Sequence, residues 1–201
     1  MKKIKRFGTK TTIALVSCFA LSLIVFHLMA SEKNAGNQFL TGVIKDIENP
    51  DAGFEIALWT DREDATYKPG DEVKFSFKTD KNCYLTLLNV STSGEVKVLF
   101  PNEYQKDNLV KAGNTYSVPG EEAKYIYKAD KPYGVEIVKA IATLKEVALY
   151  KSEEVEPTGP FQEFKETEQK VAKNIDIVLK PVDTKKWAEV EKTIRIVEDK
   201  A

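Results

Sequence analysis

The sequence of 201 residues has little of two residue types that carry much enzyme chemistry, histidine and cysteine. Its one histidine is His27, which lies in an apolar stretch near the N-terminus, and its cysteines are Cys18, in the same stretch, and Cys83. Catalytic triads, cysteine–histidine pairs and histidine-ligated zinc all need an imidazole. The remainder of the chain therefore lacks these sites, and we expect no catalytic residue, no metal ligand, no cofactor and no enzyme activity.

Acidic residues are absent from the N-terminal end of the chain, where basic residues gather. Five basic residues fall within the first ten positions, from Lys2 to Lys10, and the first acidic residue is Glu32. A charge-free apolar run from Ile13 to Ala30 follows the basic residues. This order predicts a signal peptide or an N-terminal membrane anchor over residues 1–30. We expect the remainder to be exported and to be periplasmic or membrane-anchored, facing outside the cytoplasm.

The sequence leaves three fates for this leader open. Cleavage after Ala30 would place Leu28 where a small residue is preferred. The apolar run is also long enough to remain as an anchor and so to make the membrane a partner. Acylation of Cys18 in a lipobox over residues 15–18 is the third alternative. Without the five leading basic residues the chain has 25 basic and 31 acidic residues, a formal charge of −6, which argues against nucleic acid as a partner.

The remainder of the chain changes character at Phe54. Residues 31–53 are polar and rich in glycine and asparagine, which predicts a tether, and residues 54–201 are predicted to form the folded domain. Apolar and polar residues alternate over Phe54–Leu58, Glu72–Lys78 and Glu95–Val98, as in strands with one buried face. Cys83–Val90 is more uniformly apolar, which predicts a central strand buried on both faces.

Turn residues separate these strands, and Lys68-Pro69-Gly70-Asp71 fits a type II turn. Further along, Val135–Thr143 is predicted to be a strand, Glu163–Lys173 a helix and Ile175–Leu179 a strand. Asp183 is predicted to cap a short helix over Lys185–Lys192, and Ile194–Val197 to close the sheet. The fold class predicted is mainly β, an antiparallel β-sandwich with one or two short helices near the C-terminus.

Several phrases occur together in this order: Leu58-Trp59-Thr60, Tyr67-Lys68-Pro69-Gly70-Asp71, Leu99-Phe100-Pro101-Asn102 and Pro132-Tyr133-Gly134. In order and spacing they resemble the bacterial family known as domain of unknown function 4384, over roughly residues 54–144. The resemblance implies an exported or membrane-tethered β-domain. The family has no established activity, so the resemblance implies no catalytic residue.

Tyrosines gather in the second half of the chain, where they are the candidate surface-binding residues. Tyr125 and Tyr127 share one face of a predicted strand, and Tyr133 follows closely. An exposed tyrosine patch is common where proteins bind other proteins or glycans, whereas core packing is the alternative role. Asn102 has a structural interpretation, because its side chain can hold the turn after Pro101.

These features predict a noncatalytic interaction module of the cell envelope with a protein partner. A small-ligand or glycan-binding β-domain is the alternative. A further alternative is a hydrolase that uses carboxylates alone, and its candidate residues are Glu121 with Glu122 or Glu153, Glu154 and Glu156. Neighbours on one loop do not face each other across a sugar, which disfavours the hydrolase. Cys83, in an apolar strand, is predicted to be a buried and unreactive thiol.

Overall fold

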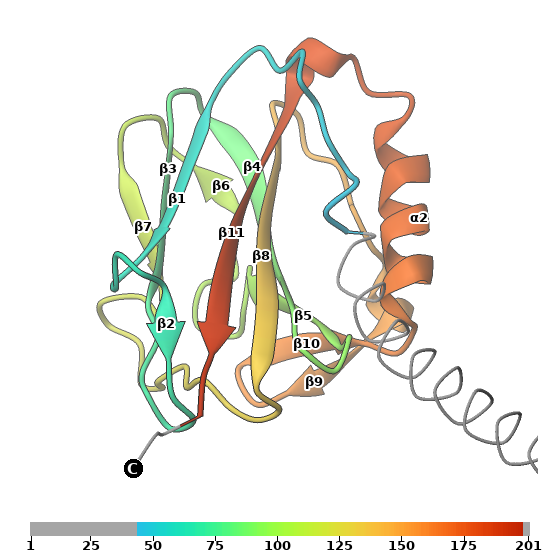
Figure 1. The fold of residues 1–201 in the computed structure, drawn as a ribbon. Coiled ribbons are helices and arrows are strands. Elements are labelled where there is room, and N and C mark those ends of the chain that lie inside the picture. The colour runs from blue at the N-terminus through green and yellow to red at the C-terminus, as the bar shows by residue number, and fades with distance from the viewer. Residues whose placement is uncertain (1–43, 199–201) are drawn as a thin grey trace, which may run out of the picture. The chain divides into compact units, whose positions relative to one another are not determined.

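A computed structural model describes residues 44–198, which form three layers. Figure 1 shows a large central sheet, with a small sheet on one side of it and a helix on the other. The predicted leader over residues 1–30 lies outside the described residues, as do residues 31–43 of the predicted tether.

The two sheets contain the strands in a non-sequential order. The small sheet is antiparallel and follows the order β1 (Ile56–Thr60), β3 (Phe75–Thr79) and β7 (Thr115–Val118). The large sheet follows the order β2 (Thr66–Tyr67), β11 (Trp187–Ile196), β8 (Gly134–Thr143), β4 (Cys83–Val90), β5 (Val96–Phe100), β10 (Phe161–Phe164) and β9 (Val155–Thr158), and β6 (Leu109–Val110) pairs with β4. Its pairs are antiparallel except for β2 with β11. The predicted antiparallel β-sandwich is confirmed.

Strand β4 contributes to a hydrophobic core on each of its faces. Leu85 and Leu87 are fully buried between the two sheets, where they join Phe75 and Phe77 of β3. The next residue, Leu88, is fully buried in the second core, on the other face of the large sheet. The uniformly apolar sequence of this strand predicts this double burial, and the structure confirms it.

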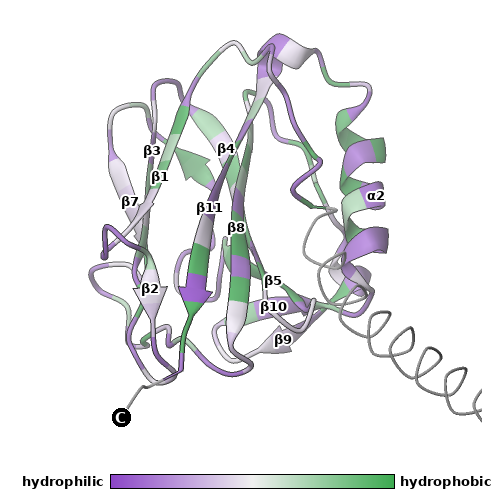
Figure 2. Ribbon diagram, in the orientation of Figure 1, coloured by the Kyte–Doolittle hydropathy of each residue, from purple (hydrophilic) through white to green (hydrophobic). Residues whose placement is uncertain are grey.

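Helix α2 (Glu168–Leu179) covers the second core. Its residues Val171, Ile175 and Leu179 are buried and recur every fourth position, which places them on one face of a helix. Figure 2 shows hydrophobic and hydrophilic residues mixed along the α2 ribbon, as this one-sided burial requires. Among residues 44–198, no helix is both long enough and apolar enough to cross a membrane.

Two sequence predictions in this region are wrong. The predicted helix over Glu163–Lys173 starts too early, since Glu163 belongs to β10, and the predicted strand over Ile175–Leu179 is the second half of α2. Isoleucine and valine favour strands locally, but only the helical arrangement presents Ile175 and Leu179 to the second core together.

The predicted helix over Lys185–Lys192 is also wrong. Asp183 does cap a helical turn, because its Oδ1 accepts a hydrogen bond from the Lys185 N–H at 3.0 Å, but this 3₁₀ turn, η2, ends at Lys186. From Trp187 the chain continues as β11 and pairs with β8 over ten residues. The long partner strand, rather than local helix propensity, decides this conformation. A second 3₁₀ turn, η1 (Ser152–Glu154), precedes β9.

The folded domain extends further toward the N-terminus than the predicted boundary at Phe54. Ile44 and Ile47 are buried in the second core, and the Ile44 N–H donates a hydrogen bond to Oε1 of Glu168 at 3.0 Å. The Asn49 side chain donates to the carbonyl oxygens of Thr184 and Trp187 at 2.7 and 2.6 Å. Ile44 and Ile47 therefore anchor this segment beside α2, and the Asn49 side chain joins it to η2 and β11.

Candidate functional site

The turn after β5 is built around the buried side chain of Asn102. Its Nδ2 donates to the Leu99 carbonyl at 2.9 Å and to the Tyr125 hydroxyl at 3.0 Å. Its Oδ1 accepts hydrogen bonds from the backbone N–H groups of Tyr104 and Gln105, both at 3.0 Å. The structural role predicted for Asn102 is thus present, and the turn it holds presents Tyr104 at the surface with 49% of its area exposed.

Four aromatic rings from three separate segments form what we call the tyrosine cluster: Tyr104, Tyr125, Tyr127 and Phe161. The centroids of Tyr104 and Tyr125 are 5.1 Å apart, and Tyr125 and Tyr127 both approach Phe161 edge-on at 5.4 and 5.7 Å. Such edge-to-face contacts are favourable beyond the burial of apolar area. The cluster therefore fixes the loop before β8 against β10 and supports the exposed ring of Tyr104.

Of the tyrosines predicted from the sequence, Tyr125 and Tyr127 are brought together and Tyr133 is not. Tyr125 and Tyr127 point to the same side, as the alternation predicts, but both are only partly exposed. Their segment is extended without a named strand, and it is joined to the small-sheet side by a hydrogen bond from the Val73 N–H to the Tyr127 carbonyl at 2.9 Å. Tyr133 is 42% exposed, and its ring lies 5.6 Å from Nζ of Lys131.

A chain of polar side chains runs inward from the cluster. The Tyr127 hydroxyl donates to Oδ1 of Asn89 at 3.3 Å, and Nδ2 of Asn89 donates to Oε2 of Glu136 at 3.0 Å. Burial raises the pKa of the Glu136 carboxyl, and burial together with the nearby Glu136 charge raises the pKa of the Tyr127 hydroxyl. Burial also raises the pKa of Tyr125. These hydroxyls therefore stay protonated at neutral pH and act as hydrogen-bonding groups.

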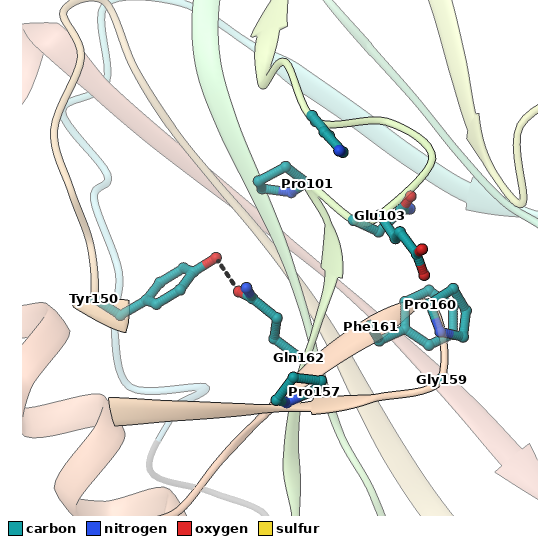
Figure 3. Close-up of a pocket in the computed structure, with 10 residues that line it drawn as sticks. Pro101, Glu103, Tyr150, Pro157, Gly159, Pro160, Phe161 and Gln162 are labelled. Atoms are coloured by element: carbon teal, nitrogen blue, oxygen red, sulfur yellow. Dashed lines mark hydrogen bonds between the residues drawn. The ribbon is translucent and has the colours of Figure 1, made fainter. Parts of the chain in front are cut away.

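Two surface depressions flank the Asn102 turn. The first has a volume of about 550 Å³ and a lining rich in proline and aromatic residues, including Pro101, Pro160 and Phe161. Figure 3 shows two of its lining residues, Tyr150 and Gln162, pointing toward each other, and the Tyr150 hydroxyl donates to Oε1 of Gln162 at 3.0 Å. We call this the proline-lined depression.

The second depression lies along strand β7 on the other side of the turn, and we call it the β7 groove. Its volume is about 520 Å³, and its lining consists of Tyr104 and Gln105, residues 115–117 of β7, and residues 120–123. Nε2 of Gln105 reaches across to donate to the Ser117 carbonyl at 3.2 Å. The groove is therefore bounded by an exposed tyrosine on one side and a strand edge on the other.

The turn, the three tyrosines of the cluster and the β7 groove belong to a stretch that matches a known family. The family described as "Domain of unknown function (DUF4384)" matches residues 66–146. The family resemblance predicted from the sequence is confirmed, with bounds close to the predicted residues 54–144. Comparison with curated proteins and with solved structures gave no match.

The DUF4384 match ends before part of the site. Strands β2 to β8, the Asn102 turn and the three tyrosines of the cluster lie within it, whereas Phe161, β10 and α2 follow it in the chain. The segments that follow residue 146 therefore complete the tyrosine cluster and cover the outer face of the large sheet.

The other candidates from the sequence occupy separate places. Cys83 is fully buried at the start of β4, and burial raises the pKa of its thiol, as predicted for a core residue. Glu121 and Glu122 are exposed neighbours at the β7 groove, and Glu154 accepts hydrogen bonds from the Lys151 N–H and from Asn174. Within residues 44–198, no group of three or more metal-ligating side chains is gathered in one place.

Sequence analysis did not select Tyr104 and Gln105 as site residues. Both follow the Phe100-Pro101-Asn102 turn, and a tyrosine two residues after a turn-forming asparagine was the available signal. The sequence does not predict that β7 lies at the edge of its sheet, because strand order follows from the tertiary structure.

Proposed function

We propose that this protein is a noncatalytic interaction module of the cell envelope, exported and possessing a protein partner, and that it binds through the face that carries the tyrosine cluster. The observation that supports this most is the pre-formed presentation of Tyr104. Its ring is half exposed, packed against Tyr125 in a tilted arrangement and held by a turn whose hydrogen bonds are internal. A rigid aromatic side chain at a surface costs little conformational entropy on binding and is typical of interface anchors.

Export is the second part of the proposal, and the sequence of the leader supports it. The basic first ten residues and the charge-free run from Ile13 to Ala30 predict passage into or across a membrane, with the domain outside the cytoplasm. The negative formal charge of the remaining chain is consistent with a protein partner rather than nucleic acid.

A small-ligand or glycan-binding role is the second candidate, and the proline-lined depression favours it. Pockets that bind small molecules are mostly apolar with a few polar groups that fix orientation. The depression combines Pro101, Pro160 and Phe161 with the Tyr150–Gln162 pair, and its volume of about 550 Å³ lies within the usual range for such pockets.

Site-specific photocrosslinking in cells that produce the full chain tests the protein-binding proposal. A photoreactive residue in place of Tyr104 should give one discrete crosslinked protein. The same residue in place of Ile177, which is 58% exposed on the outer side of α2, should not. Equal crosslinking at both positions, or none at Tyr104, would contradict the assigned binding face.

A substrate screen addresses the competing hydrolase hypothesis. The purified full chain should show no turnover of glycan, ester or peptide substrates. Turnover by the wild type that is lost in a Glu121→Gln or Glu154→Gln variant would show that the protein is an enzyme and would refute the proposal of a noncatalytic interaction module.

A further inference from the structure

The edge of β7 carries backbone hydrogen-bonding groups that point away from its sheet. In an antiparallel ladder the N–H and C=O of one residue point to the same side, and this side alternates along the strand. The Ser117 carbonyl points away from β3, because it accepts the Gln105 side chain, and Thr115 therefore points outward as well. Within residues 44–198, the Ser117 N–H and both backbone groups of Thr115 have no hydrogen-bond partner.

The remaining long sheet edges are protected, which distinguishes β7. Strand β9 has Pro157 in its middle, and proline cannot donate to an added strand. Strand β1 lies against β11, and β2 has only two residues. An exposed edge with free donors and acceptors is a template for pairing with another chain.

The β7 groove runs along this open edge and has the polar character of a peptide-binding surface. Tyr104 forms one wall, and Glu121, Glu122 and Ala123 form another. The Gln105 side-chain amide already occupies the position of an incoming strand N–H on the Ser117 carbonyl. The groove therefore accommodates an amide donor directed at the strand edge.

The charge of the groove specifies the occupant further. Two exposed carboxylates, Glu121 and Glu122, line it, and its lining contains no basic side chain. We propose that the β7 edge is a strand-addition site that takes an extended polypeptide segment of another protein bearing basic residues. This inference rests on the proposed protein-binding function and names the chemistry of its partner.

A synthetic peptide of about eight residues provides the probe. In this peptide valine alternates with threonine, except at two positions that carry lysine. The peptide carries a fluorescent label, and fluorescence anisotropy measures its binding to the purified full chain in detergent. The same peptide with every backbone nitrogen methylated keeps the side chains but has no N–H donors. We expect methylation to weaken binding by about tenfold or more, because strand addition depends on backbone hydrogen bonds.

Variants of the chain test the contribution of the β7 edge and of the groove carboxylates to binding. Thr115→Pro removes an outward N–H at the first residue of β7, where proline is tolerated, and should weaken binding by about fivefold to tenfold. Thr115→Ala is the matched control and should bind like the wild type. The double variant Glu121→Lys and Glu122→Lys should also lose binding, whereas Glu103→Lys, in the proline-lined depression, should not.

Each outcome decides the inference. Loss of binding on methylation and in the charge-reversed variant supports strand addition, even if Thr115→Pro does not fold. Binding that withstands methylation, or equal binding in the Glu121→Lys and Glu122→Lys variant, overturns it, and so does failure of the basic peptide to bind at all. If crosslinking at Tyr104 persists in that case, the interaction module stands and only the mode of recognition is wrong.

Discussion

Replacement of Asn102 by alanine tests whether this side chain organises the candidate site. The change removes the hydrogen bonds that the side chain donates to the Leu99 carbonyl and the Tyr125 hydroxyl, a longer one to Oε1 of Gln105 at 3.3 Å, and two accepted from the N–H groups of Tyr104 and Gln105. The side chain is 6% exposed, so water replaces the first two bonds poorly. At about 1 kcal/mol for each of these and about 0.5 kcal/mol for each turn bond, we expect a loss of about 3 kcal/mol.

Urea unfolding followed by tryptophan fluorescence measures this loss. With a typical slope of about 2 kcal/mol per molar urea, the midpoint should fall by about 1.5 M. Asn108→Ala is the matched control, because the Asn108 side chain makes no hydrogen bond within residues 44–198, and its effect should stay within about 0.5 kcal/mol.

A double-mutant cycle isolates the contact with the tyrosine cluster. In a Tyr125→Phe background the hydroxyl is already absent, so Asn102→Ala should cost about 1 kcal/mol less than in the wild type. If Asn102→Ala costs no more than the Asn108→Ala control, the turn does not depend on this side chain, and the rigid presentation of Tyr104 has no basis.

Three further predictions concern the core, pH dependence and the leader. Leu85→Ala should destabilise the domain by about 2–5 kcal/mol in urea unfolding, whereas Leu109→Ala, at a 37% exposed leucine, should cost much less; equal costs would refute the assigned burial. The raised pKa of Glu136 means that its carboxyl binds a proton more tightly in the folded state than in the unfolded state, so stability should fall as pH rises above about 4.5. Glu136→Gln keeps an acceptor for Asn89, so this variant should not show the fall and should be more stable than the wild type at pH 7. A pH profile of stability that is the same in the variant and the wild type would contradict this prediction. Mass spectrometry of the native protein should find an N-terminus at Ser31 or an intact or acylated leader in the envelope fraction, and a full-length soluble chain in the cytoplasm would remove the basis for export.

Local sequence was sufficient for the elements whose pattern and environment agree. The alternation over Glu72–Lys78 and the uniformly apolar run Cys83–Val90 correspond to β3 and β4. The Lys68–Asp71 turn is formed as predicted, with Gly70 at a φ of 92° and a 3.0 Å hydrogen bond from the Asp71 N–H to the Lys68 carbonyl. Proline and glycine restrict the backbone by themselves, so such turns follow from the residues alone.

The C-terminal segments depended on contacts far away in the chain. Ile175–Leu179 has the β-branched composition of a strand, and Lys185–Lys192 has charges that suit a helix, yet the first is helical and the second largely β11. Burial of one helical face in the second core stabilises the helix over Ile175–Leu179. Pairing with the backbone of β8 stabilises the strand that begins at Trp187. Local propensities are smaller than these packing and pairing energies.

The candidate site shows the same division. The sequence placed Tyr125 and Tyr127 on one face and identified Asn102 as a turn residue, because both inferences need only neighbouring residues. The ring contacts of Tyr125 with Tyr104 and with Phe161 join segments that are distant in sequence, and so does the strand order that leaves β7 at an open edge. Strand order and ring packing are properties of the assembled sheets, and only the tertiary structure could decide them.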